Sequence, residues 1–190
     1  MVRTSGPQIR GGEAAALLRL AHRPLDGLDD GFDLLLAMDW QNVNRFADEI
    51  PLDASSVMIG DPDEGEVPEI FSGTRARYVP LPLKKMAKAI PGSWTNMVAL
   101  GLAGALADIP AAALESALRG SWKRTPTALE ANLAALRAGI AAAGSIEGMP
   151  GLASAAFICT KKSYQNFELN LKIKVSGDPD AGFLQRSTLS

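Results

Sequence analysis

A glycine- and proline-rich segment near the start of the chain holds the residue types best suited to binding chemistry. It reads Ser5-Gly6-Pro7-Gln8-Ile9-Arg10-Gly11-Gly12-Glu13. Gly11 and Gly12 carry no Cβ atom, so their backbone can approach a ligand closely. Arg10 adds a permanent cation whose planar guanidinium can bind a carboxylate or a phosphate through two parallel hydrogen bonds. Arg10, Gly11 and Gly12 are therefore candidate ligand-binding residues. The same residues are also compatible with an ordinary turn in which Arg10 makes a structural ion pair.

Two charged clusters further along the chain are weaker candidates. Lys84, Lys85 and Lys88 form a basic patch, which indicates either a solvated helix face or a site for an anionic ligand. The acidic stretch 61–69 lacks the spacing of a calcium-binding loop, so we expect a solvated loop there.

The low counts of cysteine and histidine exclude several kinds of site. Cys159 is the single cysteine, so the chain supplies neither an internal disulfide nor the thiolates of an iron–sulfur cluster. His22 is the single histidine, which excludes a histidine-rich metal site. We assign no catalytic residue and no metal ligand to this chain.

The composition is that of a globular domain. The chain has 190 residues, of which 47% are hydrophobic and 21% charged, and this balance excludes a disordered chain. No apolar run approaches the ~18 residues of a membrane-spanning helix, and no apolar leader follows Met1. The net charge is −2 and no basic stripe is present, so we expect no nucleic-acid partner. We predict a cytoplasmic protein without membrane contact.

The positioning elements follow from hydrophobic periodicity. The continuous apolar run at 32–38 is typical of a strand buried on both faces of a parallel sheet. Thr95 or Asn96 is placed to cap the long helix that follows it. The order of elements predicts an α/β fold, with a small mixed or parallel sheet and packed helices. The expected strands are 13–20, 32–38, 56–59 and 77–81, and the expected helices are 42–50, 83–90, 95–108, 111–118 and 127–143.

The character of the chain changes near Gly144. Residues 144–154 are rich in Gly, Ala, Ser and Pro, which indicates a linker. Beyond it, apolar residues alternate with polar ones between Phe167 and Val175, a period-2 pattern typical of an antiparallel strand with one wet face. We predict an α/β domain at 1–145, a linker at 146–155 and a β-hairpin at 156–190.

The glycine-rich segment resembles the gamma domain of 2-oxoacid:ferredoxin (acceptor) oxidoreductases, which include the pyruvate and 2-oxoglutarate enzymes. Later landmarks have a similar order and spacing, and the resemblance covers about residues 3–145. They are the strand that ends at Asp39, the segment 42–46, Thr95-Asn96-Met97, Lys123 and Asn132. The resemblance implies oxidative decarboxylation of a 2-oxo acid to acyl-CoA by a complex that uses thiamine diphosphate, iron–sulfur clusters and CoA. In that complex this chain is a structural or assembly domain beside alpha and beta subunits, with Arg10, Gly11, Gly12 and Asn96 as cofactor-binding candidates.

The sequence departs from this family in one respect. Gamma domains begin with a strand, a glycine-rich loop and a helix before the Ser-Gly-Pro segment, whereas Met1 stands just before that segment here. We therefore expect an incomplete, N-terminally truncated Rossmann-like domain. It binds no cofactor alone and is inactive in isolation.

The tail has a resemblance of its own. Thr160-Lys-Lys-Ser-Tyr-Gln-Asn-Phe-Glu-Leu and the following Asp180-Ala-Gly turn resemble part of the 3-keto-disaccharide hydrolase (glucanase-like) family. This likeness implies a fragment or a fusion. It also implies an alternative function, that of a non-catalytic interaction or carbohydrate-binding β-sandwich fragment.

Overall fold

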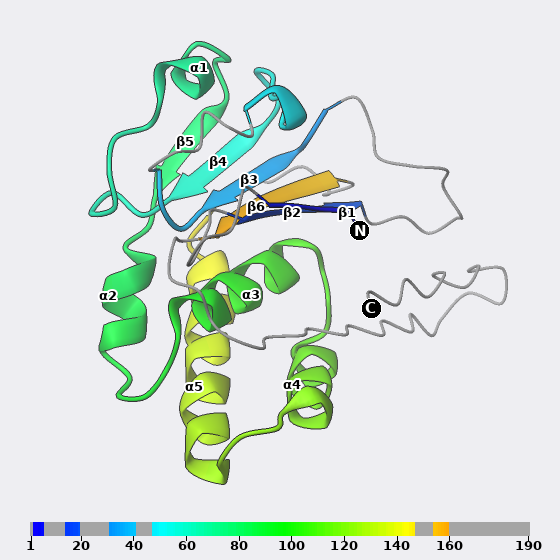
Figure 1. Ribbon diagram of the computed structural model, residues 1–190, viewed down its shortest axis with the longest axis vertical. Coiled ribbons are helices and arrows are strands. Elements are labelled where there is room, and N and C mark those ends of the chain that lie inside the picture. The colour runs from blue at the N-terminus through cyan, green and yellow to red at the C-terminus, as the bar shows by residue number, and fades with distance from the viewer. Residues whose placement is uncertain (1, 6–13, 20–30, 41–46, 147–153, 160–190) are drawn as a thin grey trace, which may run out of the picture.

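The computed structural model describes residues 2–5, 14–19, 31–40, 47–146 and 154–159. These residues form one mixed sheet in the order β1-β2-β6-β3-β4-β5, with a layer of helices beside it (Figure 1). The strands are β1 (Val2–Ser5), β2 (Ala14–Arg19), β3 (Leu34–Ala37), β4 (Val57–Gly60), β5 (Arg77–Pro80) and β6 (Ser154–Cys159). The helices are α1 (Glu69–Ser72), α2 (Leu83–Lys88), α3 (Thr95–Leu106), α4 (Ala111–Ser121) and α5 (Pro126–Ala143), with a 3-10 turn at Ala47–Glu49.

The parallel part of the sheet confirms the predicted fold class. Strands β6, β3, β4 and β5 run parallel to one another, whereas β2 is antiparallel to β6 and β1 is antiparallel to β2. All four residues of β3 are fully buried, as the continuous apolar run predicts. The predicted strands at 13–20, 56–59 and 77–81 are confirmed as β2, β4 and β5.

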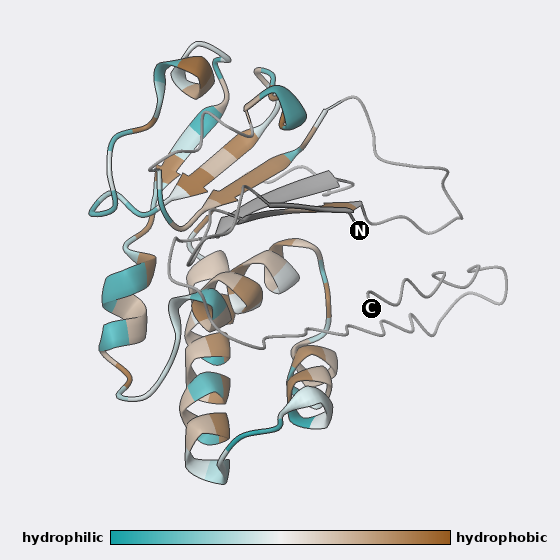
Figure 2. Cartoon of the chain, viewed as in Figure 1, coloured by the Kyte–Doolittle hydropathy of each residue, from teal (hydrophilic) through white to brown (hydrophobic). Residues whose placement is uncertain are grey.

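Alternate residues of the central strands face two separate cores. Leu34, Leu36 and Ile59 belong to the larger core, which α2, α3, α4 and α5 cover. Leu35 and Met58 belong to a smaller core on the opposite face, under α1 and the 3-10 turn. Figure 2 shows the hydrophobic residues concentrated along β3 and β4 between these layers. Among the described residues, no helix is both long and apolar enough to cross a membrane.

Strand β6 is the last of the described strands in the sequence, yet it lies inside the sheet, between β2 and β3. Ala14 of β2 pairs with Cys159, and Leu34 of β3 pairs with Ala155. β6 therefore joins the antiparallel β1–β2 ribbon to the parallel strands. The division at 145 and 155 stays a prediction, since residues 147–153 and 160–190, which include the expected hairpin, lie outside the described part of the chain.

Helices α3 and α5 pack with their backbones in direct contact. A Cβ atom added to Gly101 would lie 1.9 Å from the carbonyl oxygen of Leu136, and one added to Gly139 would lie 2.0 Å from that of Val98. Each helix thus presents a glycine to the other. This reciprocal contact requires glycine at both positions, because no side chain fits between the backbones.

The helix starts agree only partly with the sequence prediction. Thr125 caps α5 as its Oγ1 accepts a hydrogen bond from the Ala128 N–H, with Pro126 following in the first turn. The expectation that Thr95 or Asn96 caps α3 is wrong, because both lie inside the helix and Trp94 is the N-cap residue. A contact with α5 sets this start, as the Trp94 N–H donates to Asn132 Oδ1 at 3.0 Å. Of the expected helix 42–50, residues 42–46 lie outside the described part, and Ala47–Glu49 form a 3-10 turn.

Candidate functional site

Several polar segments meet at the edge of the sheet where the parallel strands end. Asp39 comes two residues after β3, and Asp61 directly follows β4. In open α/β sheets, ligands bind in the crevice outside the carboxyl ends of the strands. This strand-end region is therefore the candidate site.

The described residues on either side of the predicted binding segment lie at the same edge. Ser5 of β1 pairs with Ala14 of β2, and Ala14 pairs with Cys159 at the carboxyl end of β6. Ile158 in turn pairs with Ala37 at the carboxyl end of β3. Arg10, Gly11 and Gly12 themselves lie outside the described residues. The two residues that flank their segment nonetheless stand where the parallel strands end.

Asp61 is the most buried charged group of the region. Its side chain is fully buried, and it accepts hydrogen bonds from the backbone N–H of Asp63 at 3.0 Å and of Lys84 at 2.7 Å. These bonds fasten the start of α2 to the end of β4. The expectation of a solvated loop throughout 61–69 is thus wrong for Asp61. The burial of Asp61 cannot be predicted from the local sequence, because one of its two hydrogen-bond donors lies 23 residues away.

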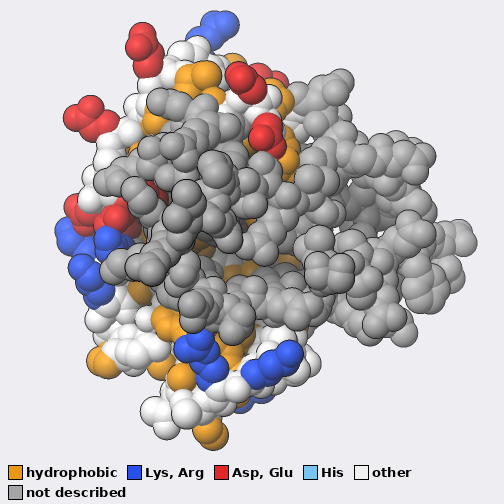
Figure 3. All heavy atoms as spheres, in the orientation of Figure 1, with side chains coloured by type: hydrophobic (Ala, Val, Ile, Leu, Met, Phe, Trp, Pro, Cys, Tyr) orange, Lys and Arg blue, Asp and Glu red, His pale blue; other side chains and the backbone are white. Residues whose placement is uncertain are grey.

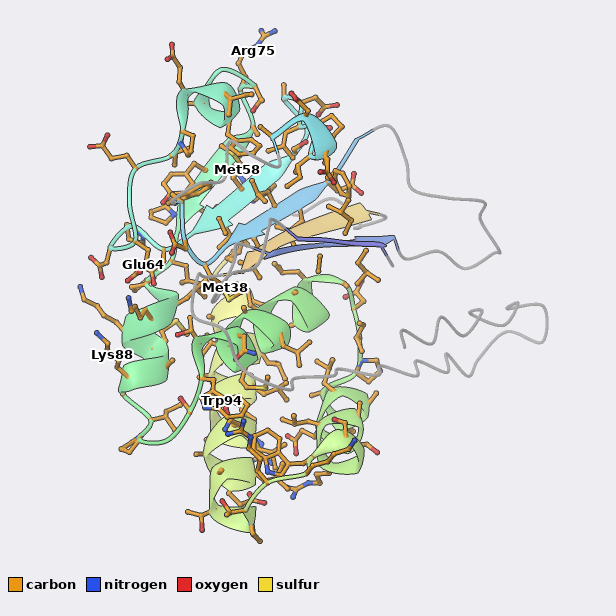
Figure 4. The ribbon with its side chains drawn as sticks, viewed as in Figure 1. Met38, Met58, Glu64, Arg75, Lys88 and Trp94 are labelled. Atoms are coloured by element: carbon orange, nitrogen blue, oxygen red, sulfur yellow. The ribbon has the colours of Figure 1, made fainter. Side chains whose placement is uncertain are left out.

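The lysines of the basic patch are partly neutralised by this acidic segment. Lys84 Nζ donates to Glu64 Oε1, and Lys85 lies 3.1 Å from Asp63 Oδ2. Donation of this hydrogen bond to the Glu64 carboxylate raises the pKa of Lys84, and the carboxylates of Asp61 and Asp39 add to that rise. Figure 4 shows Glu64 beside the first turn of α2 and Lys88 on the same helix. The patch therefore fits a solvated helix face better than an anion site.

An aromatic cluster packs near the strand ends on the face of the sheet that carries the smaller core. The indole of Trp40 lies on Gly60, where an added Cβ atom would come within 2.4 Å of the ring. Tyr78 packs edge-on against Trp40 at 6.2 Å, and its hydroxyl donates to the Gly60 carbonyl oxygen at 3.4 Å. Burial raises the pKa of Tyr78, and the carboxylate of Asp61 acts in the same direction. The phenol therefore stays protonated at neutral pH and serves as a hydrogen-bond donor.

Asn96 lies in the helix layer, at the second position of α3. Its Oδ1 is buried and has no hydrogen-bond partner among the described residues. No hydrogen bond of the described residues joins it to the strand ends. The structure therefore does not connect Asn96 with the anchors of Arg10, although its unpaired oxygen remains able to accept a bond.

The described residues offer no metal centre. No group of three or more His, Cys, Asp or Glu side chains in these ranges is arranged to hold an ion.

Parallel strands flanked by helices, with polar residues at the strand ends, define a Rossmann-like α/β domain. The model of the family described as pyruvate ferredoxin/flavodoxin oxidoreductase matches residues 1–142. The chain thus belongs to this family.

A solved structure gives the same indication. It is a 2-oxoglutarate:ferredoxin oxidoreductase from Magnetococcus marinus with 2-oxoglutarate, coenzyme A and succinyl-CoA bound. The two share 27% sequence identity and a TM-score of 0.50 over 64% of this chain and 21% of the relative's chain. The match thus spans about a fifth of that relative. No curated protein sequence matches the chain.

Proposed function

We propose that the chain acts as the gamma domain of a 2-oxoacid:ferredoxin oxidoreductase complex. In this proposal the complex oxidatively decarboxylates a 2-oxo acid to acyl-CoA, and the chain supplies assembly contacts and part of the CoA site. The observation that carries it is the family match over residues 1–142. The solved relative with coenzyme A and succinyl-CoA bound supports the substrate class.

In this proposal the redox steps belong to partner chains. A cubane iron–sulfur cluster needs four cysteine ligands, and this chain has one cysteine. We assign thiamine diphosphate and the clusters to the alpha and beta subunits. When bound there, they supply the carbanion and electron-transfer chemistry.

The strand-end region is the proposed contact for CoA. Ser5 and Ala14, the described residues before and after Arg10–Gly12, lie at the edge where α/β domains bind ligands. A guanidinium suits the phosphates of CoA, because its fork donates two parallel hydrogen bonds to one phosphate group. The two glycines allow that phosphate to approach the backbone.

The test is CoA binding by the assembled complex, measured by isothermal titration calorimetry. Arg10→Lys keeps the charge and loses the planar fork, so CoA affinity should fall by about 1–3 kcal/mol, the range for charge-assisted hydrogen bonds. The matched control is Arg75→Lys, since Arg75 precedes β5 at the opposite edge of the sheet (Figure 4). Equal CoA affinity in wild type and Arg10→Lys would remove Arg10 from the site. A complex that assembles without this chain would overturn the proposed function.

A further inference from the structure

Two tryptophans and an arginine stack on one another in the helix layer, at the start of α3 and just after α4. Trp94 stands at the start of α3 and Trp122 at the end of α4, and their ring centroids lie 5.4 Å apart. The guanidinium carbon of Arg124 lies 4.9 Å from the centroid of the Trp94 ring. Both indoles are part-exposed, whereas Arg124 and its neighbour Lys123 are exposed. We call these four residues the aromatic–cation surface.

The backbone around this surface is held in place by specific hydrogen bonds. Asn132 of α5 is fully buried, and it accepts from the Trp94 N–H at 3.0 Å while its amide donates to the Ala128 carbonyl at 2.7 Å. The Trp122 indole N–H donates to the Thr125 carbonyl at 3.2 Å. The stack is thus pre-organised, which lowers the entropy cost of binding a partner.

The charges of this surface are not balanced within the described part of the chain. Arg119 pairs with Glu130 at 2.9 Å, and Arg137 pairs with Glu115 at 2.6 Å. No carboxylate of the described residues pairs with Lys123 or Arg124. Figure 3 shows basic side chains at the lower end of the molecule, where α4 and α5 lie, and acidic ones mainly at the upper end. Two cations therefore remain available to an external anion.

We propose that the aromatic–cation surface is a docking site for an acidic segment of a partner subunit. A guanidinium stacked on an indole keeps its N–H edge free, and that edge fits the carboxylate of an Asp or Glu side chain. The flanking indoles supply apolar area, and Trp and Arg are the residues that dominate binding energy at protein interfaces. This inference rests on the proposed function, because the partner is taken to be a subunit of the same complex.

Two observations favour a polypeptide over other anions. The chain carries a net charge of −2 and shows two unpaired cations here rather than a basic stripe, which disfavours nucleic acid. The solved relative carries the matched region within a chain of which it is 21%, so the corresponding domain there has a much larger polypeptide attached to it. A domain of this kind needs a surface that contacts the remainder.

The experiment measures the dissociation constant between the purified full chain and the co-expressed alpha and beta subunits, by biolayer interferometry. Arg124→Gln should weaken binding by about tenfold or more, the size of effect expected from a hot-spot residue. Lys123→Gln should weaken it less. The matched control is Arg119→Gln, which removes the same charge from a residue already paired with Glu130. Arg124 is exposed, so the melting temperature of Arg124→Gln should stay at the wild-type value.

The salt dependence gives a second readout. Between about 0.05 and 0.5 M NaCl the wild-type affinity should fall, and Arg124→Gln should show a shallower fall, since one screened contact is already missing. Wild-type binding that Arg124→Gln and Lys123→Gln leave unchanged would overturn this inference and leave the proposed function standing. Failure of the wild-type chain to bind the subunits at all would overturn both.

Discussion

Replacing Gly101 with alanine tests the closest contact in the helix layer. The new methyl carbon would lie 1.9 Å from the Leu136 carbonyl oxygen and 3.1 Å from the Ile140 nitrogen, whereas ordinary contact begins at 3.4 Å. Both neighbours are backbone atoms of α5, so no side chain can rotate away. Helices α3 and α5 must therefore move apart by roughly 1.5 Å, which opens the core around Val98 and Leu102.

The size of the effect follows from two opposing contributions. Overpacking of a core costs about 1–3 kcal/mol, and the rigid backbone contact places this site at the upper end. Alanine regains up to about 1 kcal/mol of helix propensity over glycine. The net loss of about 2 kcal/mol corresponds to a melting temperature lower by roughly 4–8 °C in a chain of this size.

The assay is thermal unfolding followed by circular dichroism, with Gly120→Ala as the matched control. Nothing lies within 4 Å of a Cβ atom at Gly120 in α4, so that variant should gain up to about 1 kcal/mol. Gly139→Ala should repeat the loss, since its Cβ atom would meet Val98. A Gly101→Ala variant that melts at or above the wild-type temperature would refute the close packing of α3 on α5.

The remaining predictions concern three other contacts. Asn132→Leu removes the acceptor of the Trp94 N–H and should cost about 1–3 kcal/mol in urea unfolding; an unchanged midpoint would contradict this. The hydrogen bond that Arg137 donates lowers the pKa of Glu115 below its usual value of 4.5. The ion pair therefore stabilises the fold fully above the pKa of Glu115 in the unfolded chain. This stabilisation is lost as the pH falls through the lower pKa of the folded state. Acidification from about pH 6 to pH 3 should therefore destabilise wild type more than Glu115→Gln, and equal losses would argue against the pair. Removal of β6 leaves β1 and β2 as a two-stranded ribbon, which is marginal in water, so a chain ending at residue 146 should lose its cooperative melt.

The elements predicted correctly are those whose signal is local. The strands β3 and β4 are continuous apolar runs bounded by turn residues, and such runs indicate buried parallel strands wherever they occur. The start of α5 also has a local signal, because the Thr125 side chain caps the helix and Pro126 occupies its first turn. These features depend on neighbours within a few residues.

The features that the sequence did not reveal depend on distant partners. Asp61 belongs to an acid-rich stretch typical of a solvated loop, and its burial is stabilised by two backbone N–H donors, of which that of Lys84 in α2 is distant in sequence. Trp94 and Trp122 are 28 positions apart, so their stacking with Arg124 follows from helix packing rather than from a motif. The pairing of Ala14, which follows the Arg10 segment, with Cys159 of β6 likewise requires a strand that lies about 140 residues later in the chain.

Enzyme turnover tests most directly whether the chain is a working part of a 2-oxoacid oxidoreductase. The measurement is CoA-dependent reduction of a viologen dye by a 2-oxo acid, with the alpha and beta subunits prepared with and without this chain. We predict turnover when all chains are present, a strong loss when this chain is omitted, and none from this chain alone. Full turnover by the alpha and beta subunits without this chain would contradict the claim.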